Sequence, residues 1–265
     1  MNARKKFESH FKIHKIDTSS GETKDAPKKT AEIAVDIILS QIEEQISEEI
    51  LVLSKQRIKG LFGAKTFLPA SDAMNLIKTF HAEGKYLPRE EAEGNADLVQ
   101  ALPLAIIRNA TGAILRLRRR EKSDDNPLHE KIVIWAGGHV RREDAVNGDP
   151  LLHCVMRELE EELRLNIERT ALNLVGSIYL DIGGRTSNHV AIAYEWRAKS
   201  DDVAVALSNA EFFERRGTSL SGSFIDLSNL AKDVEEKKII EPWSEELVRN
   251  CLAANSRNLN PKLPF

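Results

Sequence analysis

Cysteine is scarce in this sequence of 265 residues, which holds only Cys154 and Cys251. Two cysteines cannot form the set of disulfides that stabilises small secreted proteins, and neither stands in the Cys-x-x-Cys spacing of a structural metal site. We therefore expect two reduced, partly buried thiols in a cytoplasmic protein. The fold must then depend on a hydrophobic core, which a chain of this length is able to bury.

The sequence also lacks a long apolar segment and a strong charge of either sign. No apolar run approaches the roughly 18 residues that a membrane-spanning helix needs. The first residues, Met-Asn-Ala-Arg-Lys-Lys, have no apolar core of a secretory signal. With 38 basic and 41 acidic residues, the net charge is −3. We expect no membrane partner, and no basic excess gives a strong signal for nucleic acid.

The N-terminal part of the chain divides into three segments by composition. Residues 1–29 are polar and predict a disordered tail. Residues 30–47 carry isoleucines at three- and four-residue spacing and predict an amphipathic helix, whose apolar stripe would pack on the main domain or on a second subunit. A homodimer is therefore left open. Residues 48–95 are expected to pack on the main domain, with a strand at 50–53, a loop at 61–69, a helix at 71–80 capped by Ser71 or Asp72, and a connection at 87–94.

The main domain is expected to span residues 96–265. Apolar runs and turn residues predict strands at 101–107, 113–118, 131–136, 172–180 and 190–197, and a last short strand or turn at 223–227. Helices are predicted at 150–164 and 242–253, each beginning with a proline. Strands before, around and after one helix indicate an α/β (α+β) sandwich with a mixed central sheet.

The helix predicted at 150–164 carries three carboxylates on one face. At about 100° per residue, Glu158, Glu161 and Glu162 lie within about 100° of one another, beside an apolar stripe. Like charges at this spacing repel one another and destabilise a helix. A hard divalent cation removes that repulsion, and Mg²⁺ often joins protein carboxylates to substrate phosphates. The alternative is a solvated acidic face of an ordinary surface helix.

The surrounding residues resemble the Nudix box, Gly-x5-Glu-x7-Arg-Glu-φ-x-Glu-Glu-x-Gly-φ, where φ is aliphatic. Gly138 matches its first glycine, Arg157-Glu158-Leu159-Glu160-Glu161-Glu162-Leu163 matches its helix, and Leu165 matches its last position. The resemblance implies a Nudix-like α/β/α sandwich, here with an N-terminal helical extension. It also implies a MutT-like hydrolase that uses Mg²⁺, or Mn²⁺ in its place.

The family pattern implies roles for five residues at this site. Glu158, Glu161 and Glu162 would be metal ligands, together with the carbonyl of Gly137. Glu158 would also be a candidate general base, and Arg157 would orient a glutamate by ion pairing. The catalytic set implied by the resemblance is therefore Glu158, Glu161 and Arg157.

The chain departs from the family pattern at three places. The first glutamate of the box is replaced by Asp144, with Glu143 beside it as an alternative. The loop before the helix is roughly five residues longer than in the pattern, which costs little free energy, and it ends in Asp149-Pro150, a typical helix start. The glycine after the helix is replaced by Arg164, and we expect Asn166 to supply the left-handed cap instead.

Further segments resemble a little-described bacterial branch of MutT-like phosphoesterases, which carries a segment similar to residues 48–95 before its main domain. The matching segments are Tyr86-Leu87-Pro88-Arg89-Glu90-Glu91-Ala92-Glu93, Leu128-His129, Gly137-Gly138-His139-Val140 and Glu241-Pro242-Trp243-Ser244. The resemblance assigns no substrate.

Two more residues are candidates for substrate binding. Arg118 shares a strand face with Arg116 and would contact phosphate, unless this end of the strand is simply solvated. His139 follows the glycine pair and faces the site, or serves as a structural hydrogen bonder. The family often has an additional acidic ligand, for which Glu211 or Glu214 is the candidate.

The predicted function is Mg²⁺-dependent hydrolysis of a phosphoanhydride bond in a small molecule, such as a nucleoside diphosphate linked to another group. The alternative is a non-catalytic module of the same fold that senses a nucleotide or a phosphosugar. The substitutions at Asp144 and Arg164 keep that alternative open. No motif defines a pocket for a base or a sugar, so the sequence does not identify the substrate.

Overall fold

The computed structural model describes residues 35, 48–119, 131–145, 148–201, 203, 205–207, 212, 222–236 and 240–252. The chain divides into two compact units, residues 1–46 and 47–265. The predicted tail and, apart from Val35, the predicted amphipathic helix lie outside the described residues. The expected packing of that helix, on the main domain or on a second subunit, therefore stays a prediction. All that follows concerns the second unit. In the described residues, no helix is both long and apolar enough to span a membrane.

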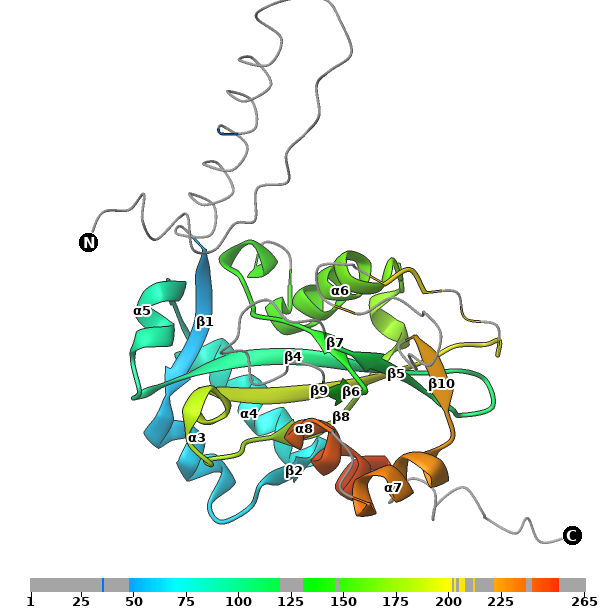
Figure 1. The fold of residues 1–265 in the computed structure, drawn as a ribbon. Helices are drawn as coiled ribbons and strands as arrows, with labels where there is room; N and C mark the ends of the chain where they lie inside the picture. Colours follow the sequence, from blue (N-terminus) through cyan, green and yellow to red (C-terminus); the bar gives the residue numbers. More distant parts are fainter. Residues whose placement is uncertain are drawn as a thin grey trace, which may run out of the picture. The chain divides into compact units, whose positions relative to one another are not determined.

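A mixed sheet forms the centre of this unit (Figure 1). Its principal strands follow the order β10 (Ser223–Ile225), β5 (Ile114–Arg118), β4 (Leu98–Arg108), β9 (His189–Arg197), β8 (Leu172–Ile178) and β2 (Phe67–Pro69). β4 and β9 pair in parallel over nine residues on each strand, from Gln100 opposite His189 to Arg108 opposite Arg197. The other pairs are antiparallel. The predicted α/β class with a mixed sheet is confirmed.

Residues of the N-terminal segment join the same sheet. β1 (Glu49–Ser54) pairs with β3 (Lys85–Pro88) on one side and with β4 on the other. Short strands β6 (Ile132–Val133) and β7 (Ala136–Gly137) pair with β5 and β4. β7 therefore places the Gly137-Gly138 turn directly beside the middle of β4.

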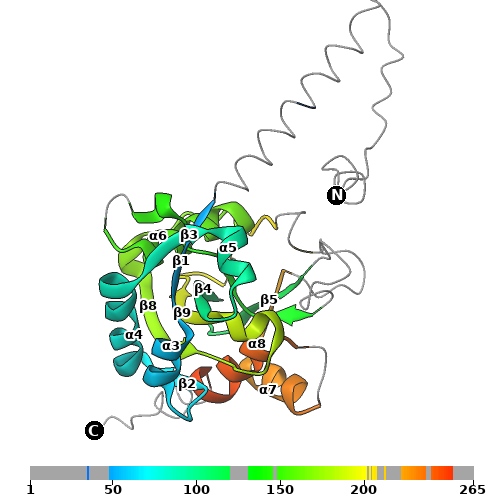
Figure 2. The ribbon, with the colours of Figure 1, turned by 90° about the vertical axis from the view of Figure 1, so that its left-hand side faces the viewer.

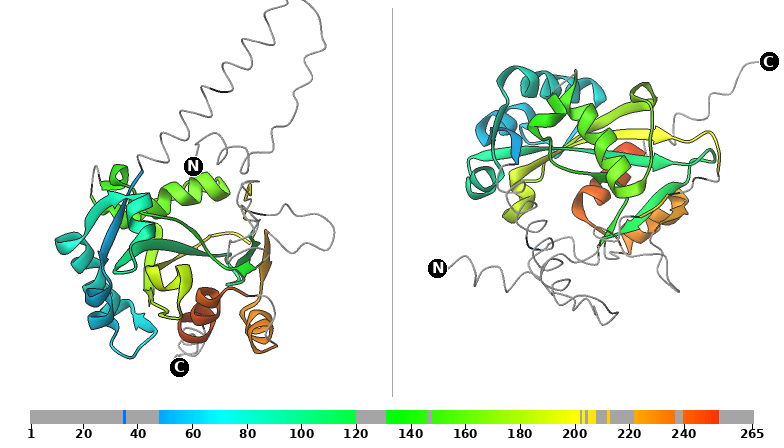
Figure 3. Two further views of the ribbon diagram at one scale, coloured as in Figure 1. Left: turned by 60° about the vertical axis from the view of Figure 1, so that its left-hand side comes forward. Right: turned by 90° about the horizontal axis from the view of Figure 1, so that it is seen from above.

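Helices cover both faces of the sheet, which gives three layers. α4 (Ala70–Glu83) and α6 (Pro150–Leu163) lie on one face, and α7 (Leu227–Glu235) and α8 (Pro242–Glu246) lie on the other (Figures 1 and 2). α8 continues as a π-helical turn, η4 (Leu247–Leu252). Seen from above, α6 crosses the strands of the sheet (Figure 3). The core between these layers is apolar, with residues such as Leu104, Ile106 and Leu159 fully buried.

Several short elements differ from the sequence prediction. The segment predicted as a loop at 61–69 contains the end of α3 (Lys55–Phe62) and β2, and the predicted connection at 87–94 contains the end of β3 and α5 (Arg89–Gly94). The predicted strand at 131–136 is divided into β6 and β7, and α7 follows β10 where no helix was predicted. α4 begins after Pro69 without a side-chain cap, so the predicted cap at Ser71 or Asp72 is wrong. Tertiary contacts decide such short elements more than local propensity does.

Candidate active site on helix α6

Local sequence features fix both ends of α6. The side chain of Asp149 accepts a hydrogen bond from the backbone N–H of Leu151, and Pro150 occupies the first turn. At the other end, Arg164 itself adopts the left-handed conformation, with φ of 55° and ψ of 33°. The expectation that Asn166 supplies this cap is therefore wrong. A non-glycine residue in this conformation costs some free energy, which the two hydrogen bonds of the helix end, from Arg164 N and Leu165 N, offset.

Two of the predicted carboxylates meet at one arginine. Nη1 of Arg157 donates to Oε1 of Glu158 at 2.6 Å and to Oε2 of Glu161 at 3.2 Å. Glu158 is buried, whereas the side chain of Glu161 is 48% exposed. The two carboxylates therefore lie next to each other, one at the base of the site and one open to solvent.

Arg157 is in turn held from the loop before the helix. Its Nε donates to Oδ1 of Asp144 at 3.0 Å and its Nη2 donates to Oδ2 at 3.1 Å, while Nη2 also donates to the carbonyl of His139 at 3.0 Å. Asp144 lies on the short 3₁₀ helix η1 (Arg142–Ala145) and is buried. The shorter acid at this position, and the longer loop that follows it, therefore leave a two-point ion pair intact.

Glu162 faces a different partner. Its Oε1 accepts a hydrogen bond from Nη1 of Arg119 at 2.7 Å, and its Oε2 accepts one from the backbone N–H of Gly137 at 3.1 Å. Both side chains of this ion pair are buried, at 8% and 6% exposure. The Arg119 guanidinium also lies over the rings of Trp135 and Phe212. Glu162 thus fastens α6 to the glycine turn and to the end of β5.

The sequence prediction selected Arg118 from the basic run, and Arg119 was missed as a site residue. Arg119 alternates in the strand with Leu115 and Leu117, both fully buried, which was the available signal that its side chain points inward. Arg118, at the end of β5, is partly buried, and its predicted phosphate contact stays a prediction. Arg116, predicted to share its face, pairs with Asp233 at 3.5 Å.

Gly138 and Glu158 are in close contact. A Cβ atom on Gly138 would collide with the carboxylate of Glu158, so only glycine leaves room for that side chain. Burial raises the pKa of Glu158 above its ordinary value, although Arg157 beside it acts in the opposite direction. Its negative charge is therefore incompletely compensated in the protein alone.

His139 is partly buried and lies against a second histidine. Its Nε2 lies 3.1 Å from Nε2 of His189, and the two rings are 5.2 Å apart. Burial, assisted by the nearby positive charge of Arg89, lowers the pKa of His139 well below the usual value, so His139 itself is neutral near pH 7. The predicted substrate contact of His139 stays a prediction, and the contacts seen for its ring and carbonyl are structural.

The donor set suits a hard cation bound by two carboxylates rather than three. Among the described residues, no three His, Cys, Asp or Glu side chains lie close enough together to hold a metal ion. Glu158 and Glu161 nevertheless converge beside an open face, and Mg²⁺ is commonly bound through one or two carboxylates plus substrate phosphates and water. The incompletely compensated charge of Glu158 fits the same ion. Glu211 and Glu214 lie outside the described residues.

The other aromatic and sulfur side chains near the site have packing roles. Trp135 and Trp243 are buried with ring centroids 5.9 Å apart, and Trp135 donates to Glu241. Cys154 is buried, free and within 3.2 Å of the His139 carbonyl, and burial raises its pKa well above the ordinary value. The side chain of Cys251 lies outside the described residues.

Comparison with known proteins supports the assignment of the fold. No protein-family model and no curated protein matches the chain. Among solved structures, the chain is similar to Tm1382, described as a Nudix hydrolase, with a TM-score of 0.56 and 21% identity over 80% of this chain and 100% of that one. DR0079 from Deinococcus radiodurans gives a TM-score of 0.43 and 20% identity over 57% and 82% of the two chains. The MutT protein from Methanosarcina mazei Go1 gives a TM-score of 0.42 and 20% identity over 60% of this chain and 96% of that one.

The similarity to Tm1382 extends over 80% of this chain and the whole of that one. The loop and helix of the box occupy the place that the sequence pattern implies, between β7 and β8, with Arg157 joined to Asp144. This chain therefore has the fold of the Nudix superfamily.

Proposed function

We propose that this protein is a Mg²⁺-dependent hydrolase that cleaves a pyrophosphate bond in a nucleoside diphosphate-linked or related small molecule. The observation that carries the proposal is the meeting of Glu158 and Glu161 at Arg157, which Asp144 anchors beside the glycine turn. This arrangement puts two hard oxygen ligands at an open face. The guanidinium of Arg157 keeps both carboxylates in place.

Glu158 and Glu161 would hold the metal ion, and the Gly137 carbonyl and Glu162 are the further ligands implied by the family resemblance. A bound Mg²⁺ would neutralise phosphate charge and lower the pKa of a bound water. Glu162 already accepts hydrogen bonds at both oxygens, from Arg119 and Gly137 N, so as a ligand it would use a remaining lone pair of one of these oxygens.

The chain's own residues supply positioning and proton transfer in this proposal. Arg157 holds the carboxylates of Glu158 and Glu161 in a fixed relation, which lowers the entropy lost on binding substrate. Glu158, with its raised pKa, would accept at its carboxylate oxygen the proton of the attacking water. Burial around Glu158 limits competing water.

The test is release of a nucleoside monophosphate or phosphate from a panel of nucleoside diphosphate-linked compounds, with Mg²⁺ or Mn²⁺. Glu161→Gln should abolish turnover and leave the fold intact, because this side chain is half exposed. Turnover that is unchanged in this variant, or that needs no divalent metal, would overturn the proposal.

One observation favours a second candidate, a sensor that binds a nucleotide or phosphosugar without hydrolysis. Each of the three helix glutamates is paired with an arginine, and the described residues contain no ready-made group of three metal ligands. A sensor would bind members of the same panel, measured by calorimetry, with no product released over hours in the presence of either metal.

A further inference from the structure

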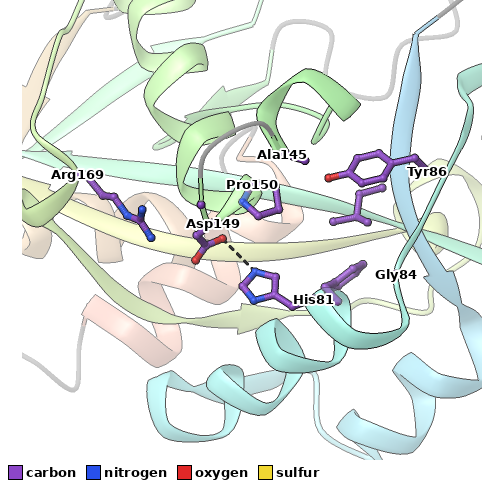
Figure 4. Close-up of a pocket in the computed structure, with 10 residues that line it drawn as sticks. His81, Gly84, Tyr86, Ala145, Asp149, Pro150 and Arg169 are labelled. Carbon is purple, nitrogen blue, oxygen red and sulfur yellow. Dashed lines mark hydrogen bonds and ion pairs between the residues drawn. The ribbon is translucent and has the colours of Figure 1, made fainter.

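A cavity of about 510 Å³ lies at the N-terminal end of α6, away from the glutamates (Figure 4). Its lining comes from β1, the end of α4, β3, η1, the loop before α6 and the 3₁₀ helix η2 (Arg169–Ala171). Part of that loop is the stretch by which the chain exceeds the Nudix box. None of Glu158, Glu161 and Glu162 lines the cavity. The lining residues are Leu51, Phe80, His81, Gly84, Tyr86, Ala145, Gly148, Asp149, Pro150 and Arg169.

One end of the cavity offers an unused hydrogen-bond donor. The hydroxyl of Tyr86 points toward Ala145 and Pro150 in Figure 4, and its oxygen is buried without a hydrogen-bond partner. Burial, reinforced by the nearby charge of Asp144, raises the pKa of Tyr86 to about 12. The hydroxyl therefore keeps its proton and is able to donate. Buried polar atoms are rarely left unpaired, so this donor points to an oxygen acceptor on an occupant.

The other end of the cavity carries the positive charge of Arg169. Arg169 extends from η2 toward Asp149 (Figure 4), and none of the acidic side chains that the structure describes forms an ion pair with it. A Cβ atom on Gly148 would lie 3.0 Å from Nη1 of Arg169, so the bare backbone there lets the guanidinium lie against the loop. The guanidinium of Arg169 therefore lies close to the Gly148 backbone at the rim of the cavity.

Asp149, the carboxylate in the cavity, makes its printed contacts with groups other than Arg169. Oδ1 of Asp149 accepts from the backbone N–H of Leu151 at 3.0 Å and lies 3.2 Å from Nε2 of His81. The start of α6 also stabilises a negative charge at this position. Between the two polar ends, Leu51, Phe80 and Pro150 provide apolar surface.

We propose that this cavity is a second small-molecule site, which binds an anionic ring compound of about mononucleotide size. The phosphate or carboxylate of the ligand pairs with Arg169, its ring packs on Phe80 and Pro150, and an oxygen acceptor at its far end receives the Tyr86 hydroxyl. The volume lies within the roughly 300–1,000 Å³ that is typical of ligand pockets. This site does not depend on the hydrolysis proposed for the glutamates.

The test is calorimetric titration of the full chain with adenosine 5′-monophosphate and, separately, with 4-hydroxybenzoate. A chelator is present, so that no metal ion occupies the glutamate face. We expect one of the two probes to bind. Arg169→Ala should weaken that binding by about tenfold or more, because it removes a charge-assisted contact, and Tyr86→Phe should weaken it by about threefold or more. Phenylalanine keeps the ring on which Arg142 stacks, so the fold is preserved.

Matched variants separate the site from general effects. Arg197→Gln removes an exposed arginine outside the cavity and should leave binding unchanged, and so should Glu161→Gln. Binding of the nucleotide alone identifies a phosphate ligand, and binding of the benzoate alone identifies a carboxylate ligand. If neither probe binds, or if binding is the same in Arg169→Ala as in the unchanged protein, the proposal is overturned.

Discussion

Arg157 and Asp144 form a two-point ion pair, with Nε to Oδ1 at 3.0 Å and Nη2 to Oδ2 at 3.1 Å. The pair joins the loop before α6 to the helix that carries the glutamates. The opposite side of the same guanidinium binds Glu158 and Glu161. The position of the two carboxylates therefore depends, through Arg157, on the position of the loop that carries Asp144.

This relationship predicts the effect of Asp144→Asn. Removing the charge leaves Arg157 with an incompletely paired, largely buried guanidinium, which should lower the free energy of unfolding by about 3 kcal/mol. Proposed hydrolysis should fall by about 10–100-fold, as is typical when a group behind a metal ligand is lost. Urea unfolding and steady-state kinetics measure the two effects. Glu143→Gln changes an exposed neighbouring residue and should alter neither the free energy of unfolding nor the rate of hydrolysis.

Glu161→Gln should separate activity from stability. The side chain is 48% exposed and its pair with Arg157 is a surface interaction, so stability should change by less than about 1 kcal/mol. Proposed metal-dependent turnover should fall by about 100-fold or more, since the change removes an oxygen ligand. Glu160→Gln makes the same charge change on the exposed neighbouring position and is the control. Equal turnover in the two variants would contradict the assignment of Glu161.

The two glycines of the turn should respond differently to alanine. A Cβ on Gly137 would collide with the backbone of Pro103 and Leu104, which cannot move easily, so Gly137→Ala should destabilise the fold by about 1–3 kcal/mol. A Cβ on Gly138 would meet only the end of the Glu158 side chain. Gly138→Ala should therefore displace that carboxylate and reduce turnover more than stability. Thermal unfolding measures the loss of stability in each variant, and steady-state kinetics measures the loss of turnover. Equal losses of stability in Gly137→Ala and Gly138→Ala would contradict this prediction.

Glu241 should give stability a measurable dependence on pH. Burial raises its pKa above the ordinary 4.5, although four hydrogen bonds, from Trp135, Trp243 and Ser244, act in the opposite direction. The folded state thus binds this proton more tightly than the unfolded state. The resulting stability is fully present below pH 4.5 and is lost as the pH rises through the folded pKa.

The measurement is the free energy of unfolding in urea between about pH 4 and pH 8, for the unchanged protein and for Glu241→Gln. The stability of the unchanged protein minus that of the variant should decrease with rising pH, because only the glutamate ionises. Glu235→Gln, at an exposed position, should give a flat difference. A difference for Glu241→Gln that rises with pH would show that the hydrogen bonds outweigh burial.

The features that the sequence predicted well are local ones. α6 was expected at 150–164 and spans Pro150–Leu163, because Asp149-Pro150 and the apolar spacing act within a few residues of each other. The hairpin of β4 and β5 follows from the turn at Asn109–Gly112 in the same way, since the backbone of Asn109 pairs with Ala113. The shared face of the glutamates follows from helix geometry alone.

The features that the sequence did not predict depend on residues far apart in the chain. α3 has only Ile58 and Phe62 buried, so its periodicity is too short to detect, and its helix is stabilised by the sheet beneath it. The pairing of Arg119 with Glu162 joins residues 43 positions apart. The alternation of Leu115 and Leu117 indicated an inward side chain at position 119, but it could not name Glu162 as the partner.

The sequence by itself determined the class of fold, the central helix and the one edge of that helix on which the acidic side chains stand, because these depend on short-range periodicity and capping. Tertiary structure decided how those side chains are paired. It placed Glu158 and Glu161 on Arg157, turned Glu162 to Arg119, and formed an open cavity between Tyr86 and Arg169. The physical reason is that ion pairs and cavities form between elements, and their partners are set by how the sheet brings distant segments together.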